Sequence, residues 1–255
     1  MNKTLAEASS TVEAIIRAVE SVSDVDVAIC PTFTAIDRIR HLVAGTHLMV
    51  GAQDVFWKDS GAFTSSISAA MLKDLDCSYC IVGHSETRGR FGKLEVPETT
   101  IGYFAETDET VNLKTKALLF QSISPILCVG ETLAERESGN TDGVIGDQLR
   151  NGLAGIDTSE FTEGIIAYEP VWAIGTGKTC DTPEAERVCG MIRDLLTSIF
   201  DTETASKVRI LYGGSVKPNN AAELFNQPNI DGGLVGGASL DPNDFSEIVR
   251  AAFYS

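Results

Sequence analysis

Seven short apolar runs recur along the chain, rich in β-branched residues and mostly ended by a glycine or a polar residue. Near-continuous apolar strands of this kind are typical of a parallel sheet that is covered on both faces. Segments with helical periodicity separate the runs, and this alternation predicts βαβ units in a parallel α/β fold. The runs lie near residues 26–30, 47–52, 78–83, 125–130, 164–169, 208–213 and 233–238.

Helical periodicity begins at residues 5–22, before the first apolar run, and returns at 111–120, 183–200 and 244–252. Thr182, with a proline directly after it, predicts a helix start in which its hydroxyl is the cap.

Residues 92–103 contain Pro97 and show no strong periodicity. We expect an extended loop here, after the strand that ends at His84. No composition shift or low-complexity tract interrupts the chain, so residues 1–255 are expected to form a single domain.

Acidic residues outnumber basic ones, 36 to 20, and the formal net charge is −16. This charge argues against nucleic acid and against an anionic membrane surface as partners. No apolar run is long enough to span a bilayer, and no signal peptide is recognised before the first helix. We therefore expect a soluble protein of the reducing cytoplasm.

Most of the six cysteines lie inside apolar, strand-like runs. Cys77 and Cys80 form a C-x-x-C pair, which is compatible with a redox pair or with half of a zinc site. No second C-x-x-C and no nearby histidine pair completes a metal site. Buried thiols are the favoured interpretation, and no metal is expected.

Seven parallel strands can form an open doubly wound sheet, or an eight-stranded barrel from which one strand is missing. A dinucleotide-binding sheet would carry G-x-G-x-x-G after its first strand, and none is present there. The sequences G-G-S at 213–215 and G-G-A at 236–238 follow the last two runs instead, where barrels commonly bind phosphate. The pattern favours a (β/α)₈ barrel with seven strands in this chain.

His84, Glu169 and Ser215 each stand at the end of a predicted strand. Alone, each is as well explained by capping or structural pairing. Together, at the end of the strands where barrel active sites form, they predict a catalytic site. Residues 170–179, P-V-W-A-I-G-T-G-K-T, are stiff at the start and glycine-rich in the middle. They predict a hinged lid whose N–H groups close on an anion, with a plain linker as the alternative.

Long segments of the chain resemble the triosephosphate isomerase family, in the family's order and over nearly the whole length. They are V-A-I-C-P-T-F-T, V-G-A-Q-D, G-A-F-T, V-G-H-S-E, C-V-G-E-T-L-A-E-R-E, A-Y-E-P-V-W-A-I-G-T-G-K-T, Y-G-G-S-V-K-P and D-G-G-L-V-G-G-A-S-L. The resemblance implies interconversion of dihydroxyacetone phosphate and glyceraldehyde 3-phosphate, a step of glycolysis and gluconeogenesis.

The resemblance also implies roles for individual residues. Glu169 would be the general base, and neutral His84 would polarise the carbonyl group and relay protons. The phosphate would be held by the backbone at Gly175, Ser215, Gly236 and Gly237. No cofactor or metal is needed, because the only charge that develops is an enediolate.

Family members begin with a strand that runs into N-x-K-M-N, and Met1 and Asn2 correspond to the last two residues of that motif. We therefore expect the first strand to be missing, together with the active-site asparagine and lysine. Glu86, the usual partner of that lysine, would be left unpaired or would reach Arg88 or Arg90. Low activity is expected, and an inactive phosphate-ligand binder on the same scaffold is the alternative function.

Further features concern the surface and the surroundings of His84. Residues Gly61–Ser68 resemble the loop that docks into the partner subunit in family dimers. Asp54 and Thr87 stand where the family usually has Asn and Arg. The segment 92–103 is longer than usual, and we expect it to extend the rim near His84 or to shield the place of the missing strand.

Overall fold

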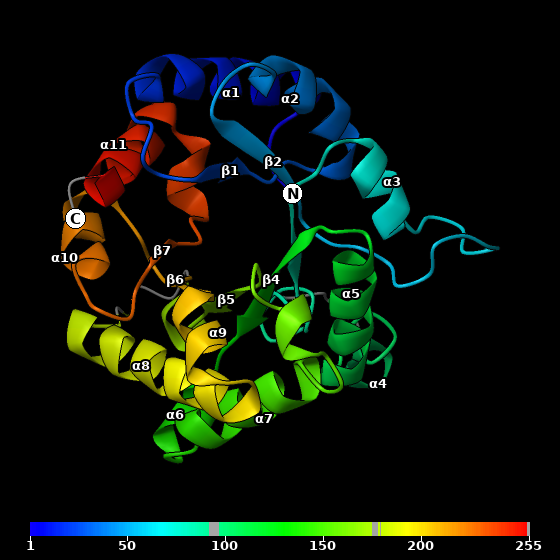
Figure 1. Ribbon diagram of the computed structural model, residues 1–255, viewed down its shortest axis with the longest axis vertical. Helices are drawn as coiled ribbons and strands as arrows, with labels where there is room; N and C mark the ends of the chain where they lie inside the picture. The colour runs from blue at the N-terminus through cyan, green and yellow to red at the C-terminus, as the bar shows by residue number, and fades with distance from the viewer. Residues whose placement is uncertain (92–96, 175–177, 179, 254–255) are drawn as a thin grey trace.

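Seven parallel strands pair in the order in which they occur in the chain (Figure 1). An open doubly wound sheet reverses its strand order at a switch point, so this sequential order excludes it. The computed structural model describes residues 1–91, 97–174, 178 and 180–253. The strands are β1 Val27–Ile29, β2 Leu48–Ala52, β3 Tyr79–Val82, β4 Ser124–Val129, β5 Ile165–Tyr168, β6 Arg209–Tyr212 and β7 Gly232–Gly233.

Helices surround the strands as an outer ring in Figure 1, which is the arrangement of a TIM-type barrel. They are α1 Leu5–Val19, α2 Ile36–Val43, α3 Ala69–Asp74, α4 Glu98–Ile101, α5 Asp108–Phe120, α6 Leu133–Glu137, α7 Thr141–Gly152, α8 Thr182–Ile199, α9 Thr202–Lys207, α10 Pro218–Phe225 and α11 Pro242–Phe253. Four short 3-10 helices complete the description: η1 Phe33–Ala35, η2 Thr158–Glu160, η3 Val171–Ala173 and η4 Gly237–Leu240.

The sheet does not close between β1 and β7 within the described residues, although the helix layer does close there. Helix α1 packs against α11, and the guanidinium of Arg250 donates to the carbonyl oxygen of Ala18 at 2.6 Å. Val12, Ile15 and Val19 bury the inner face of α1. The result is a barrel of seven strands that is open on one side, beneath a continuous pair of helices.

Three expectations about local structure are wrong. The last apolar run forms a strand only at Gly232–Gly233, and Gly237–Leu240 forms η4, because glycines without side chains to pack make a weak strand. Helix α8 begins one residue early: Asp181 is its cap, and the Asp181 carboxylate accepts the Glu184 N–H at 2.9 Å. Helix α1 ends at Val19 rather than Val22.

The long segment after β3 contains one short helix, α4, which follows Pro97. The described part of this segment lies beside α5 (Figure 1), and Ile101 packs close to Gly89 on the turn that carries His84. Residues 97–103 take no part in lining the open side of the barrel. The described part therefore extends the surroundings of the His84 turn and does not shield the space between β1 and β7.

All six cysteines are free thiols, and four of them, including Cys77 and Cys80, are buried. Burial raises the pKa of Cys77 to about 11, which keeps the thiol protonated and unreactive near neutral pH. Within the described residues, no group of three or more His, Cys, Asp or Glu is placed to hold a metal ion. None of the described helices is both long enough and apolar enough to cross a membrane.

Candidate active site

The site is organised around a carboxylate and an imidazole at the carboxyl ends of two strands. Glu169 follows β5, and His84 follows β3. Nε2 of His84 lies 3.0 Å from Oε1 of Glu169. The Glu169 residue is only 2% exposed, while the His84 side chain retains 28% exposure. The structure therefore brings together the two residues that the sequence predicts as base and acid.

Ser85 supplies two further hydrogen bonds to the Glu169 carboxylate. The sequence did not predict this residue as part of the site. Its backbone N–H donates to Oε2 of Glu169 at 2.9 Å, and its hydroxyl donates to Oε1 at 3.0 Å. Ser85 is 2% exposed. A carboxylate removed from water needs such donors to remain charged. The only sequence signal was its position inside H-S-E, directly after His84.

The second ring nitrogen of His84 faces a donor. The backbone N–H of Glu86 points to Nδ1 at 3.2 Å. Since Nδ1 accepts there, the neutral ring carries its proton on Nε2, the nitrogen that faces Glu169. Burial lowers the pKa of His84, but the hydrogen bond from its ring to Glu169 and the charges of Glu169, Glu86 and Glu106 outweigh burial, so the pKa is raised overall.

Two glycines give the Glu169 backbone its place. A Cβ atom on Gly130 would overlap the carbonyl oxygen of Glu169, and one on Gly213 would lie 3.0 Å from the Glu169 Cγ. The Gly213 N–H also donates to the backbone carbonyl oxygen of Tyr168 at 2.7 Å. Close approach of three strand ends is therefore possible only without side chains at these positions.

A buried carboxylate braces the start of the predicted lid. Glu131 is fully buried, and its Oε1 accepts from the Trp172 indole at 2.7 Å and from the Tyr168 hydroxyl at 3.3 Å. Burial raises the pKa of Glu131, although these donors and Arg136 oppose that rise. The Arg136 guanidinium also lies 4.3 Å from the centroid of the Trp172 ring. These contacts hold Trp172, at the start of the predicted lid, against the carboxyl ends of β4 and β5.

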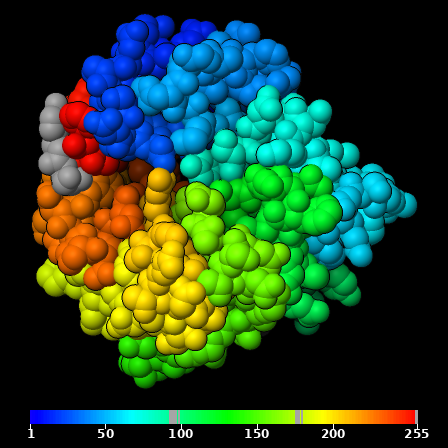
Figure 2. Space-filling view, viewed as in Figure 1, coloured from blue at the N-terminus to red at the C-terminus, as the bar shows by residue number. Residues whose placement is uncertain are grey.

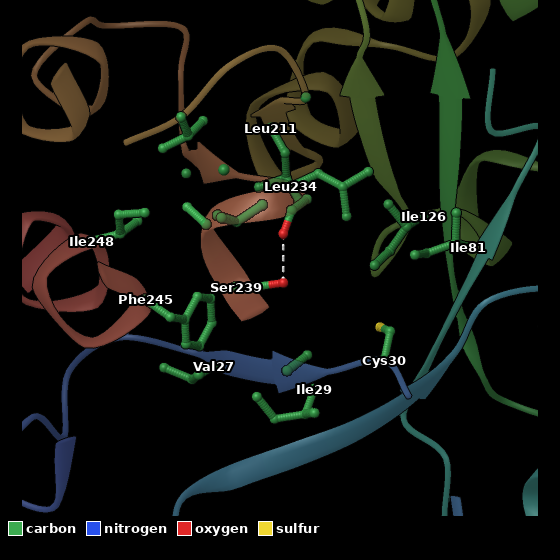
Figure 3. A pocket seen from close by; sticks show the side chains of 18 of the residues that line it. Val27, Ile29, Cys30, Ile81, Ile126, Leu211, Leu234, Ser239, Phe245 and Ile248 are labelled. Atoms are coloured by element: carbon green, nitrogen blue, oxygen red, sulfur yellow. Dashed lines mark hydrogen bonds between the residues drawn. The ribbon is translucent and has the colours of Figure 1, made fainter. Parts of the chain in front are cut away.

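His84 and Glu169 border a cavity of about 1730 Å³ that extends to the open side of the barrel. Its deep part is apolar (Figure 3): Ile81, Ile126 and Leu211 face Val27 and Ile29 across it. Phe245 and Ile248 of α11 line the side where β1 and β7 do not meet. The polar end of the cavity, by contrast, is formed by the strand ends.

Ser215, Gly236 and Gly237 line the same cavity. A Cβ atom on Gly236 or Gly237 would meet nothing within 4 Å, so the space beside them is open. Neither N–H group is donated to an acceptor among the described residues. The Ser239 hydroxyl turns back to the Gly236 carbonyl oxygen at 2.7 Å (Figure 3). Free N–H groups beside open space suit an anion.

The remaining predicted site residues have mixed outcomes. Gly175 lies outside the described residues. Glu86 does not reach Arg88 or Arg90: Arg88 pairs with Asp108 and Arg90 with Glu135. The Glu86 carboxylate lies instead 3.9 Å from Nδ1 of His84, because both arginines are turned toward nearer carboxylates.

Lys3 also lines the cavity. Its ammonium group donates to the Leu240 carbonyl oxygen at 2.6 Å, at the end of η4. It is therefore held by the glycine-rich turn and forms no ion pair with Glu169.

A parallel barrel whose strand ends hold a buried carboxylate against an imidazole belongs to the TIM-barrel class, and the position of the pair is that of an active site in this class. The sequence model described as "Triosephosphate isomerase" matches residues 1–252. The triosephosphate isomerase of Endomicrobium trichonymphae is 49% identical over 250 residues, which cover 98% of this chain and 94% of that protein. Those of Trichlorobacter lovleyi and Moorella thermoacetica are each 48% identical, over 97% and 98% of this chain and 94% of each relative. The chain belongs to the triosephosphate isomerase family.

Proposed function

We propose that this protein interconverts dihydroxyacetone phosphate and D-glyceraldehyde 3-phosphate. The observation that carries the proposal is the pairing of buried Glu169 with His84 Nε2 at 3.0 Å, in a cavity that also contains the open Gly236–Gly237 turn. Relatives named triosephosphate isomerase support the substrate.

Glu169 is the base in this proposal. Its carboxylate takes a proton from the carbon next to the carbonyl group and returns it to the neighbouring carbon, so no oxidant or cofactor is consumed. The Nε2–H of His84 donates to the oxygen on which negative charge develops, and the imidazole relays the hydroxyl proton from the neighbouring oxygen to it, so that protons balance while the carbonyl group changes carbon. Ser85 holds the carboxylate while the site is empty, and the carboxylate leaves these two donors to face the substrate carbon.

The phosphate group is placed at the other end of the polar rim. The N–H groups at Gly236 and Gly237 and the backbone at Ser215 supply donors without a side-chain cation. Gly175 is retained as a proposed fourth contact, on the strength of the family resemblance alone.

We infer further that residues 1–255 alone turn over slowly. Among the described residues, Glu169 forms an ion pair with His84 and with no lysine or arginine. The cavity is also open toward β1 and β7, where water enters, and water weakens the electrostatic stabilisation of an enediolate.

We also propose a homodimer through Gly61–Ser68. Figures 1 and 2 show the chain around residue 60, in cyan, standing out from the rest of the surface. Phe63 on this loop is 41% exposed, and its ring lies 4.9 Å from that of Phe56. An apolar side chain on a projecting loop suits insertion into a second copy of the chain.

A coupled isomerase assay tests the proposed reaction, with Glu169→Gln as the control. Loss of the base is expected to lower kcat by roughly 10²–10⁴-fold. Equal turnover by the two proteins would reject the reaction. If calorimetry then showed that inorganic phosphate still binds, the alternative of a non-catalytic phosphate binder would replace it.

A further inference from the structure

A cluster of charged and hydroxyl side chains with buried Lys114 at its centre lies against the His84 turn. Its other members are Glu106 and the partly exposed Asp54 and Thr87, which line the same cavity as His84. The Lys114 ammonium lies 2.6 Å from the Asp54 carboxylate and 2.6 Å from that of Glu106. The side chains of Lys114 and Glu106 are each only 7% exposed. A lysine this enclosed is available to its two carboxylates and not to a ligand.

One oxygen of Glu106 is directed at the turn that carries His84. Its Oε2 accepts from the Gly83 N–H at 3.1 Å and from the Thr87 hydroxyl. Its Oε1 faces Lys114. One oxygen of the Glu106 carboxylate is therefore fixed by Lys114. The other oxygen holds the Gly83 N–H before His84 and the Thr87 hydroxyl after it.

The Thr87 hydroxyl lies between two acceptors, because it is also 2.9 Å from the His84 carbonyl oxygen. A hydroxyl has one proton, so it donates to one acceptor at a time. The charged Glu106 is the stronger acceptor. The His84 carbonyl oxygen still accepts the Arg88 N–H at 2.9 Å.

The backbone at Gly83 needs this restraint. Its φ angle is +69°, in the left-handed region, and glycine adopts positive and negative φ values about equally readily. The residue directly follows β3, and its N–H is taken by Glu106 rather than by a neighbouring strand. Arg88 also holds the turn, through Nε to the Gly83 carbonyl oxygen at 2.7 Å. Loss of the Glu106 acceptor would remove the restraint on the Gly83 N–H and allow the Glu86 N–H to shift away from Nδ1 of His84.

We infer that Glu106 and Thr87 are positioning residues for His84. They hold the Gly83–Arg88 turn so that the Glu86 N–H meets Nδ1 and the ring proton stays on Nε2. Lys114 orients the Glu106 carboxylate, and Asp54 is the second carboxylate on the same ammonium. The inference rests on the proposed function for its catalytic consequence, since His84 is the acid there, but the ring geometry it describes is independent of turnover.

The decisive comparison is Thr87→Val against Thr87→Ser. Valine has nearly the same shape but no hydroxyl, whereas serine keeps the hydroxyl. Ring-nitrogen NMR of His84, recorded without substrate and at a pH above the raised pKa of His84 so that the ring is neutral, measures the tautomer. The two shifts differ strongly for a single tautomer and converge when both tautomers are populated. We expect convergence in Thr87→Val and in Glu106→Gln, and the wild-type spectrum in Thr87→Ser. Glu109→Gln removes an exposed carboxylate on helix α5, which carries Lys114. It is the matched control for Glu106→Gln and should retain the wild-type spectrum.

Turnover provides the second readout. A misplaced acid is expected to lower kcat by roughly ten- to a hundredfold in Thr87→Val, with little change in KM and with recovery in Thr87→Ser. Wild-type ring shifts in folded Thr87→Val would overturn the inference, whatever the activity. If all variants, including wild type, lack isomerase activity while the ring shifts change as expected, the proposed function fails and the positioning role stands. If Glu106→Gln does not fold, the threonine pair alone decides.

Discussion

The Glu169 carboxylate receives three hydrogen-bond donors from two consecutive residues, and one of them, His84 Nε2 at 3.0 Å, is itself oriented by the Glu86 N–H behind it. The proposed base and acid are therefore coupled to each other in this structure. The proton on Nε2 is stabilised by the carboxylate that it faces, and the carboxylate is oriented by that N–H and by the two donors of Ser85. In the proposed reaction, the substrate separates Glu169 from His84 before either acts on it.

This relationship has a consequence for pH. Because the pKa of His84 is raised above its ordinary 6.5, the folded state holds a proton that the unfolded state releases. Such a group stabilises the fold fully below its unfolded-state pKa, and the stabilisation is lost as pH rises through the folded-state pKa. We expect the difference in unfolding free energy between wild type and His84→Gln to shrink as the pH rises above the ordinary histidine pKa of about 6.5 and through the raised pKa of His84.

Urea unfolding at several pH values measures this difference. His41→Gln is the control, since His41 lies on the exposed face of α2 at 60% side-chain exposure. A difference for His84→Gln that stays constant over the range would show that Glu169 does not raise the pKa of His84.

Removal of the Ser85 hydroxyl is expected to destabilise the protein. Hydrogen bonds to buried charged groups contribute about 1.5–3 kcal/mol, so Ser85→Ala should lower the free energy of unfolding by roughly that amount. Ser85→Thr retains the hydroxyl and should lose less. Ser198→Ala, at an exposed hydroxyl that bonds within its own helix, sets the baseline. Chemical denaturation at constant pH distinguishes them, and a Ser85→Ala value equal to that of Ser198→Ala would argue against the Ser85–Glu169 bond.

Most of the strands could be predicted from runs of apolar, β-branched residues in the sequence. The strands β3 to β6 were predicted because consecutive apolar side chains such as Ile165 and Ile166 are buried on both faces of the sheet. The bounds of β7 were predicted poorly, because four of the residues from 232 to 237 are glycines, which have no side chain to pack. Helix α5 begins at Asp108, three residues before the expected start at 111. Its cap is a reciprocal pair of threonines, Thr107 and Thr110, and not the usual Ser or Thr with Glu. Buried Lys114 also interrupts the apolar pattern of the inner face of the helix.

The candidate site was predictable where a residue type stands at a strand end, and not where its role depends on distant contacts. His84 and Glu169 were found in that way. Ser85 was not, because its partner Glu169 lies 84 residues further along the chain. The same holds for Lys114, whose burial makes sense only beside Asp54, 60 residues before it.

Gly130 offers a test of backbone packing behind the base. A Cβ atom there would overlap the Glu169 carbonyl oxygen, which is backbone and cannot rotate away. We expect Gly130→Ala to cost about 1–3 kcal/mol of stability and to reduce kcat by displacing Glu169. Gly102→Ala is the matched control, because a Cβ atom at Gly102 meets nothing within 4 Å. Equal unfolding midpoints and equal kcat in the two variants would contradict the close approach of β4 and β5.

The projecting loop allows a test of assembly. If Phe63 inserts into a second copy, Phe63→Ser removes an apolar anchor whose loss typically costs at least about 2 kcal/mol of binding free energy. The dimer dissociation constant should then rise more than tenfold, since 1.4 kcal/mol corresponds to tenfold. Sedimentation velocity over a dilution series measures it. Phe120→Ser is the control, because Phe120 is 79% exposed on α5 and lies outside the loop. A wild-type protein that is monomeric at every concentration would reject the proposed dimer. A dimer that Phe63→Ser leaves intact would place the interface elsewhere on the surface.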